Sequence, residues 1–184
     1  MTTDTLSNWL KLVTLMIGVV GGVVALIRGA YEISENTRQH RADLRWKQAN
    51  AAKELLSDIH HDQRAAAAVL MMDWSDRPRN YDIGSGQQTS LSYKDVLAAL
   101  AKKTDEDSDQ KETYIRDSFD WFFYYLDRIE HYIETGLIEY VDVASVFRPY
   151  VRKIRKNNDV YGQFIASHEY ELVPQFISRF GASR

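Results

Sequence analysis

The clearest hydrophobic pattern lies in the second half of the chain. Large apolar residues recur there at alternating spacings of four and three positions: Ile115, Phe119, Phe122, Leu126, Ile129 and Ile133. This period is typical of one face of an α-helix. It predicts a helix over residues 111–135, ended by Gly136. The aromatic residues between these positions widen the apolar surface, which predicts a central helix with Phe122 and Leu126 buried and Asp120 solvated.

The remaining apolar positions predict shorter helices separated by polar breaks. The expected ranges are 38–59, 63–74, 93–103, 142–157 (bent or interrupted near Pro149) and 160–180, the last as one or two helices with Pro174 near a start. Asp62 and Asp142 are expected to cap helices. Residues 75–92 and 104–110 read as a loop and an acidic connection, and no segment alternates cleanly as a strand does. The fold class is therefore predicted to be all-α, a bundle of about five or six helices preceded by one transmembrane helix.

The transmembrane prediction concerns the segment from Leu12 to Ile27, which is uncharged and almost entirely apolar. At a rise of about 1.5 Å per residue it covers about 24 Å, slightly less than a hydrocarbon core of about 30 Å, and Trp9 and Leu10 extend it. A cleaved signal peptide or a buried core helix are the alternatives. The retained anchor is favoured for two reasons. Asp4 precedes the run where a signal peptide has positive charge, and Arg28 occupies a position where a cleavage site needs a small residue. The expected organisation is a transmembrane anchor over 1–30, a juxtamembrane helix or hinge over 31–43 and a helical domain over 44–184.

The cations around this segment predict its orientation. Only Lys11 precedes it. The cations that follow it are Arg28, Arg38, Arg41, Arg45 and Lys47. Because cationic flanks stay on the cytoplasmic side, we expect a single-pass protein of the plasma (inner) membrane, with its N-terminus outside and its helical domain in the cytoplasm.

Gly18 and Gly22 within the apolar run form a GxxxG pair. Small residues at this spacing let two helices approach closely in lipid, so the pair is a candidate dimerisation face. The alternative is that glycine is simply common in membrane helices. The partners predicted on these grounds are the membrane and either another protein or a second copy of the chain.

Composition narrows the chemistry. The chain has no cysteine, which excludes disulfides, thiol catalysis and thiolate metal sites. Its net charge of −3 argues against a nucleic-acid partner. No phosphate-binding glycine loop or serine nucleophile motif is present, and no cofactor is expected.

One ionisable cluster is a candidate metal site. It contains Asp58, His60, His61 and Asp62 at a predicted break between helices. His61-Asp62 matches the His-Asp dipeptide of metal-dependent phosphohydrolases, which would need further ligands from elsewhere in the fold. The favoured interpretation is a polar helix junction in which Asp62 is a cap.

A second cluster is basic. It consists of Arg148, Arg152, Lys153, Arg155 and Lys156. Positions 148, 152 and 155 or 156 share a helix face, which could bind nucleic-acid phosphate, anionic lipid headgroups or an acidic partner. The alternative is a solvated face whose charges favour the helix C-terminus. Asp120, Asp127 and Glu134 likewise share a face of the central helix and are expected to form its solvated polar side.

Two segments, RADLRWKQANAAKELLSDIHHDQRAAAAVL and FFYYLDRIEHYIETGLIEYVDVASVFRPYVRKI, carry a resemblance. Together they resemble a bacterial family of uncharacterised membrane proteins that pair an N-terminal span with a helical cytoplasmic domain. The resemblance covers about half the chain, and it lies in helix ends and apolar spacing. It implies an anchored helical architecture, transfers no functional residues and leaves the function open.

These patterns lead to three functional hypotheses. The leading one is a membrane-tethered, non-enzymatic interaction or effector module. The second is a metal-dependent hydrolase built around His60, His61 and Asp62. The third is a membrane-active effector that oligomerises through its glycine face.

Overall fold

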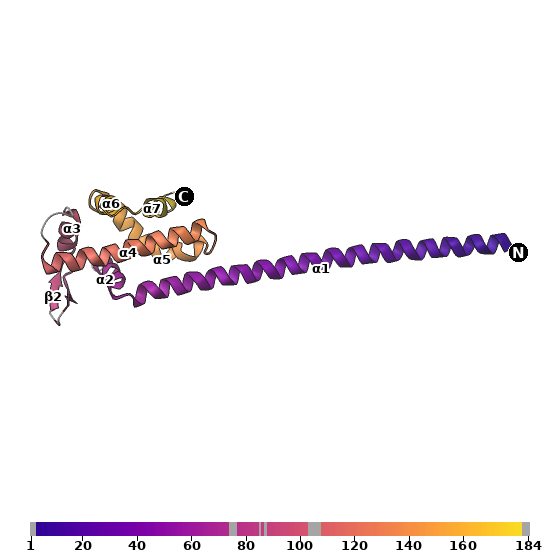
Figure 1. Ribbon diagram of the computed structural model, residues 1–184, viewed down its shortest axis with the longest axis horizontal. Coiled ribbons are helices and arrows are strands. Elements are labelled where there is room, and N and C mark those ends of the chain that lie inside the picture. Colours follow the sequence, from indigo (N-terminus) through magenta and orange to yellow (C-terminus); the bar gives the residue numbers. More distant parts are fainter. Residues whose placement is uncertain (1–2, 74–76, 85, 87, 103–107, 182–184) are drawn as a thin grey trace. The chain divides into compact units, whose positions relative to one another are not determined.

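The computed structural model describes the backbone of residues 3–73, 77–84, 86, 88–102 and 108–181 (Figure 1). Side chains are described for Arg28, Tyr31, Glu32 and, within those ranges, from Ser34 onward. Over these residues the helices are α1 (Thr3–His61), α2 (Gln63–Asp73), α3 (Tyr93–Ala101), α4 (Gln110–Glu134), α5 (Tyr140–Lys156), α6 (Asn158–Ser167) and α7 (Val173–Arg179). The predicted all-α character is confirmed.

The chain divides into two compact units, residues 1–47 and residues 48–184. The first unit belongs to α1, which includes the predicted juxtamembrane residues 31–43 as helix. Among the residues described with side chains, no helix is both long and apolar enough to cross a membrane. The predicted span, residues 12–27 with Gly18 and Gly22, lies outside those residues, so it stays a prediction.

Helix α4 is the centre of the second unit (Figure 1), where it packs against α2, α3 and α7. Its predicted seam is confirmed, since Phe122 and Leu126 have no exposed surface. The neighbouring Phe123 is equally buried, and its ring centroid lies 5.9 Å from that of Phe164 on α6. Gly136 ends the helix with a φ of +72°, the left-handed conformation expected after a helix C-terminus.

The helix ends follow their local sequence. At the predicted break after α1, Asp62 Oδ1 accepts hydrogen bonds from the backbone N–H groups of Arg64 at 2.9 Å and Ala65 at 3.0 Å, which confirms Asp62 as the cap of α2. Helix α4 begins at a capping box, in which the Asp109 carboxylate accepts from Glu112 N at 2.7 Å and Glu112 Oε2 accepts from Asp109 N at 3.2 Å.

The helix α5 differs from the expectation in two respects. It begins at Tyr140, and Asp142 acts from inside its first turn, where Oδ2 accepts from the backbone N–H of Glu139 at 3.3 Å. It also continues through Pro149 without interruption. Pro149 and Ser145, whose carbonyl would have accepted the missing N–H, are both exposed, so water can satisfy that carbonyl.

The predicted loop over 75–92 contains a β-hairpin, which corrects the expectation of no strand. Strands β1 (Arg79–Asp82) and β2 (Gln88–Leu91) pair antiparallel. Each has four residues and buries one side chain, Tyr81 in β1 and Leu91 in β2. Strands this short show no repeated alternation, which is why the pattern did not reveal them.

The acidic side of α4 is also corrected. Asp120 Oδ1 accepts a hydrogen bond from the Tyr170 hydroxyl at 2.5 Å, and Asp127 Oδ1 accepts from Leu172 N at 2.9 Å. Burial and the Asp120 carboxylate raise the pKa of Tyr170, which keeps this hydroxyl a donor. The segment between α6 and α7 therefore covers a face predicted to be solvated, and only Glu134 of the three predicted positions is exposed.

One turn further along α4, Glu130 has no exposed surface. Its two carboxylate oxygens accept from Arg179 Nε at 2.7 and 2.8 Å, and Arg179 Nη2 lies 2.5 Å from Oε1. A bidentate arginine–carboxylate pair has the geometry that compensates a buried charge. This pair joins the last residue of α7 to α4.

Truncating the core should be costly. Phe122→Ala should lower the free energy of unfolding by about 3–5 kcal/mol, because it removes a fully buried aromatic ring and leaves a cavity. The control is Val141→Ala on α5, where the side chain is 63% exposed and the change should stay within about 0.5 kcal/mol. Urea unfolding of the full chain measures both, and equal losses would contradict a buried Phe122.

The Glu130–Arg179 pair gives a second prediction. Arg179→Ala should cost about 3–5 kcal/mol, because it leaves the Glu130 charge buried and unpaired. Replacing both partners, Glu130→Leu with Arg179→Leu, should recover most of that loss, since no charge is then buried. Chemical denaturation of the single and double variants tests this. A double variant that is less stable than Arg179→Ala would contradict the assignment.

Candidate functional site

The predicted metal cluster is a helix junction in the structure. Each imidazole contacts its own helix, His60 Nδ1 at 3.0 Å from Leu56 O and His61 Nδ1 at 2.7 Å from Ser57 O. Both rings are exposed. Because a carbonyl only accepts, Nδ1 carries the proton in both rings, and Asp62 is occupied as the cap of α2.

Across the residues that the structure describes, no three histidine or carboxylate side chains come together as metal ligands do. His60 and His61 are adjacent on one helix, and their side chains therefore leave it in different directions. The metal-dependent hydrolase remains an alternative that this geometry does not favour.

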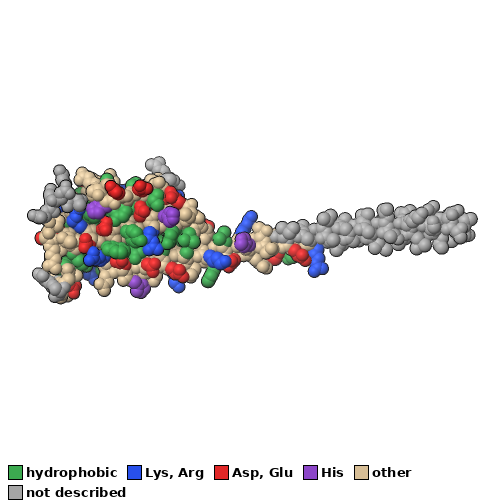
Figure 2. All heavy atoms as spheres, viewed as in Figure 1, with side chains coloured by type: hydrophobic (Ala, Val, Ile, Leu, Met, Phe, Trp, Pro, Cys, Tyr) green, Lys and Arg blue, Asp and Glu red, His purple; other side chains and the backbone are tan. Residues whose placement is uncertain are grey.

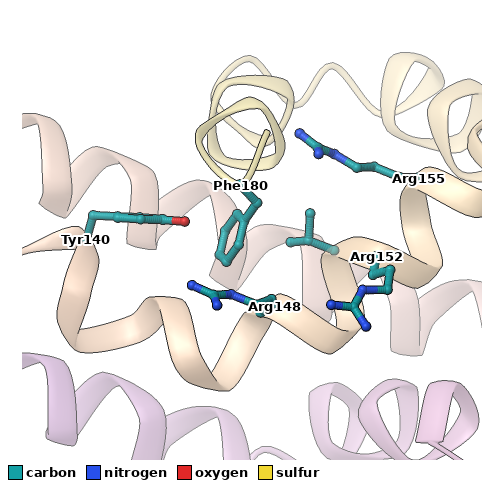
Figure 3. A pocket seen from close by; sticks show the side chains of 6 residues that line it. Tyr140, Arg148, Arg152, Arg155 and Phe180 are labelled. Carbon is teal, nitrogen blue, oxygen red and sulfur yellow. The ribbon is translucent and has the colours of Figure 1, made fainter. Parts of the chain in front are cut away.

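The basic cluster on α5 borders a pocket of about 280 Å³. We call it the α5 basic pocket, and it is lined by Tyr140, Arg148, Val151, Arg152, Arg155 and Phe180 (Figure 3). Three of the five predicted basic residues are thus brought together around one space. Their spacing of four and three residues puts them on the same side of α5.

Two of the five cations bind other helices. Lys153 Nζ donates to Met72 O in the last turn of α2 and lies 3.9 Å from Asp73 Oδ1. Arg155 Nη2 donates to Ile177 O in the last turn of α7 at 2.6 Å. Cations at helix C-termini satisfy carbonyls that lack a helical partner. Lys153 and Arg155 therefore stabilise the C-terminal ends of α2 and α7.

Tyr150 completes the contact with α2. Its hydroxyl donates to Asp73 Oδ2 at 3.1 Å. Burial, followed by the charge of Asp73, raises the pKa of Tyr150 to about 12. The phenol therefore remains a hydrogen-bond donor at neutral pH.

Among the described residues, the other three cations make no such hydrogen bond to another helix. Arg148, Arg152 and Lys156 are exposed, and no described carboxylate lies within ion-pair distance of them. The same holds for Arg155, whose bonds go to neutral carbonyls. The pocket is thus cationic within a chain of net charge −3, and its uncompensated guanidinium groups favour an anion.

Tyr140 forms another wall of the pocket. Its hydroxyl oxygen is buried and has no hydrogen-bond partner in the described structure. Its ring meets Phe180 edge to face, with centroids 5.2 Å apart. In Figure 3 this hydroxyl and the guanidinium of Arg148 point toward the same space beside Phe180. A buried hydroxyl without a partner is uncommon and costs free energy.

The arginines were predicted from the sequence, whereas the other walls of the pocket were not. Tyr140 is the first residue of α5, and Phe180 follows α7, so neither belongs to the basic cluster in the sequence. Only the folding of α7 against α4 brings Phe180 to the arginines. No local signal could have predicted that contact.

Exposed aromatic residues form another surface feature. Trp121 and Tyr124 on α4 are 40% and 45% exposed, with ring centroids 5.6 Å apart. Figure 2 shows hydrophobic side chains lying between acidic and basic ones on the visible face of the second unit. Trp121 also lines a pocket with Asp62, Gln63 and Arg64, in which Asp62 is the cap of α2 and Arg64 pairs with Asp117 at 2.6 Å.

Comparisons of the chain with protein-family models, with curated proteins and with solved structures found no match. The resemblance to a bacterial membrane-protein family therefore stays a prediction from the sequence.

Substitution of two lysines can show which cations of α5 stabilise the fold. Lys153→Ala should lower the free energy of unfolding by about 1–2 kcal/mol, because Met72 O and Asp73 lose a charged partner. Lys156→Ala, on the same helix but exposed, should change it by less than about 0.5 kcal/mol. Equal effects in urea unfolding would contradict a capping role for Lys153.

Proposed function

We propose that this chain is a membrane-tethered, non-enzymatic interaction module whose helical unit binds an anionic partner through the α5 basic pocket. The observation that carries the proposal is the set of three arginines, Arg148, Arg152 and Arg155, which line one pocket without a described carboxylate partner. A cleft lined by charges of one sign concentrates ions of the opposite sign, so this cationic pocket is suited to an anionic ligand.

The tether is proposed from the sequence. The uncharged run from Leu12 to Ile27 is of the composition that inserts into lipid. The excess of cations after it favours the inner membrane with the helical unit in the cytoplasm. A tether of this kind raises the concentration of a binding site near the membrane without requiring catalysis. Pairing through Gly18 and Gly22 would add a second copy.

Fractionation of cells that express the full chain with a reporter after Arg184 tests the tether. The chain should stay in the membrane fraction in alkaline carbonate. A reporter that is active only in the cytoplasm should be active at this fusion point. Val19→Asp with Val23→Asp should release it, because carboxylates at the centre of a span cost about 2.5–3.5 kcal/mol each.

The matched control is Val141→Asp, which adds a carboxylate on the exposed surface of α5 and should leave the chain in membranes. A wild-type chain in the carbonate-soluble fraction would overturn the tether. Alkaline phosphatase activity at the same fusion point would overturn the orientation.

A further inference from the structure

We propose that two copies of this chain exchange their α7 segments, residues 170–181. Each segment then packs on the surface of α4 and α5 that α7 covers, here called the α7-binding surface, of the other copy. Val173 and Phe176 on α7 have no exposed surface. The ring centroid of Phe176 lies 5.7 Å from that of Phe147 on α5. A second copy carries an identical α7, so it is a partner that this surface already fits.

Polar bonds hold the segment on α4 near both of its ends. The Tyr170 hydroxyl donates to Asp120 Oδ1 at 2.5 Å, and Arg179 Nε donates to both oxygens of Glu130, at 2.7 and 2.8 Å. In the exchanged form these bonds re-form between the two copies, so the buried Glu130 keeps its cation. The contacts of the segment therefore stabilise the closed and the exchanged forms about equally and do not decide between them.

The two forms differ at the hinge, which consists of His168 and Glu169 and joins α6 to the segment that moves. Glu169 has a φ of +57°, and among the described residues it is the one residue other than glycine with a positive φ. A side chain in this left-handed region costs free energy, and such strain is found in segments that change conformation. A short strained hinge favours exchange, because the strain is released when the hinge straightens.

Association opposes exchange, because two copies lose their independent motion when they join. The strain released at two hinges offsets part of that cost. The proposed tether would offset more of it, since two chains in one membrane meet at a raised local concentration. Exchange itself requires only the hinge and the α7-binding surface, and both belong to the second unit.

Exchange would make the α5 basic pocket a site shared by two chains. Phe180 lines that pocket beside Arg148, and it belongs to the segment that moves. In the exchanged form, the Phe180 of one copy completes the pocket of the other. Binding of the anionic partner proposed above would then take place at a site built from two copies.

The test makes use of the absence of cysteine from the chain. Arg155 Nη2 lies 3.5 Å from Ser178 O, so cysteines at these two positions would lie on opposite sides of the contact between α5 and α7. Full-length Arg155→Cys and Ser178→Cys chains with different affinity tags are co-expressed, extracted in nonionic detergent and treated with a flexible bismaleimide. Exchange should give a cross-linked heterodimer, because α7 of one chain then lies on α5 of the other.

Two controls accompany this experiment. A chain that carries both cysteines should cross-link in either form, which shows that the reagent spans the contact. Co-expression of Lys94→Cys, at an exposed position on α3, with Ser178→Cys should give roughly a tenth of the heterodimer or less, because no raised local concentration joins these positions.

Hinge variants in the cysteine chains should change the yield in opposite directions. Glu169→Gly relieves the strain of the closed form and should lower the heterodimer at least about fivefold. Glu169→Pro cannot adopt a positive φ and should raise it. The matched control, Glu171→Gly, removes the same charge from an exposed residue without a positive φ, so the yield should stay within about twofold.

Absence of the heterodimer with the natural hinge, while the chain with both cysteines cross-links, would overturn the inference. Equal yields from Glu169→Gly and Glu169→Pro would overturn it as well. A dimeric mass without this cross-link would assign the pairing to another surface, such as the face of Gly18 and Gly22, and would also refute the exchange. A heterodimer from chains that fractionate away from membranes would refute the proposed tether alone.

Discussion

A carboxylate that is completely withdrawn from water is tolerated where a cation satisfies both of its oxygens, because the cost of desolvating an unpaired charge is several kcal/mol. Glu130 on α4 meets this condition through Arg179 at the end of α7. The pair therefore fixes where α7 lies on the central helix. That position sets the carbonyl of Ile177 within reach of Arg155 and places Phe180 against Tyr140. The walls of the α5 basic pocket depend on it.

Cationic side chains that reach from one helix to the C-terminal carbonyls of another form a second organising feature. Arg116 on α4 donates to Ala99 O at 3.0 Å, at the end of α3, as Lys153 and Arg155 do for α2 and α7. Each bond satisfies a carbonyl without a helical partner and adds a charge that favours the negative end of the helix dipole. Short helices are thereby held by charged contacts as well as by apolar packing. Arg155 does this while lining the α5 basic pocket beside Arg148 and Arg152.

The local features of the fold could be predicted from the sequence, and the contacts between distant elements could not. The seam through Phe122 and the cap at Asp62 follow from spacing and side-chain chemistry within one or two turns. The solvated character expected of Asp120 was wrong, because a segment fifty residues away donates the Tyr170 hydroxyl to it. The arginine face was likewise visible as a charge pattern. The arginine face becomes a pocket only because α7 packs on α4. No local sequence pattern predicts that packing.

The shortness of α7 has a consequence for the lifetime of the site. It has seven residues, far fewer than the roughly 12–15 at which an isolated helix becomes even marginally stable. Its contacts with α4 and α5 therefore stabilise it. Local unfolding of α7 requires less free energy than unfolding of the core. Native-state hydrogen exchange would register such an opening as a subglobal unit separate from α4. Each local unfolding of α7 would remove one wall of the pocket while the aromatic core stayed folded. The same motion would therefore control both the order of α7 and the access of a ligand to the pocket.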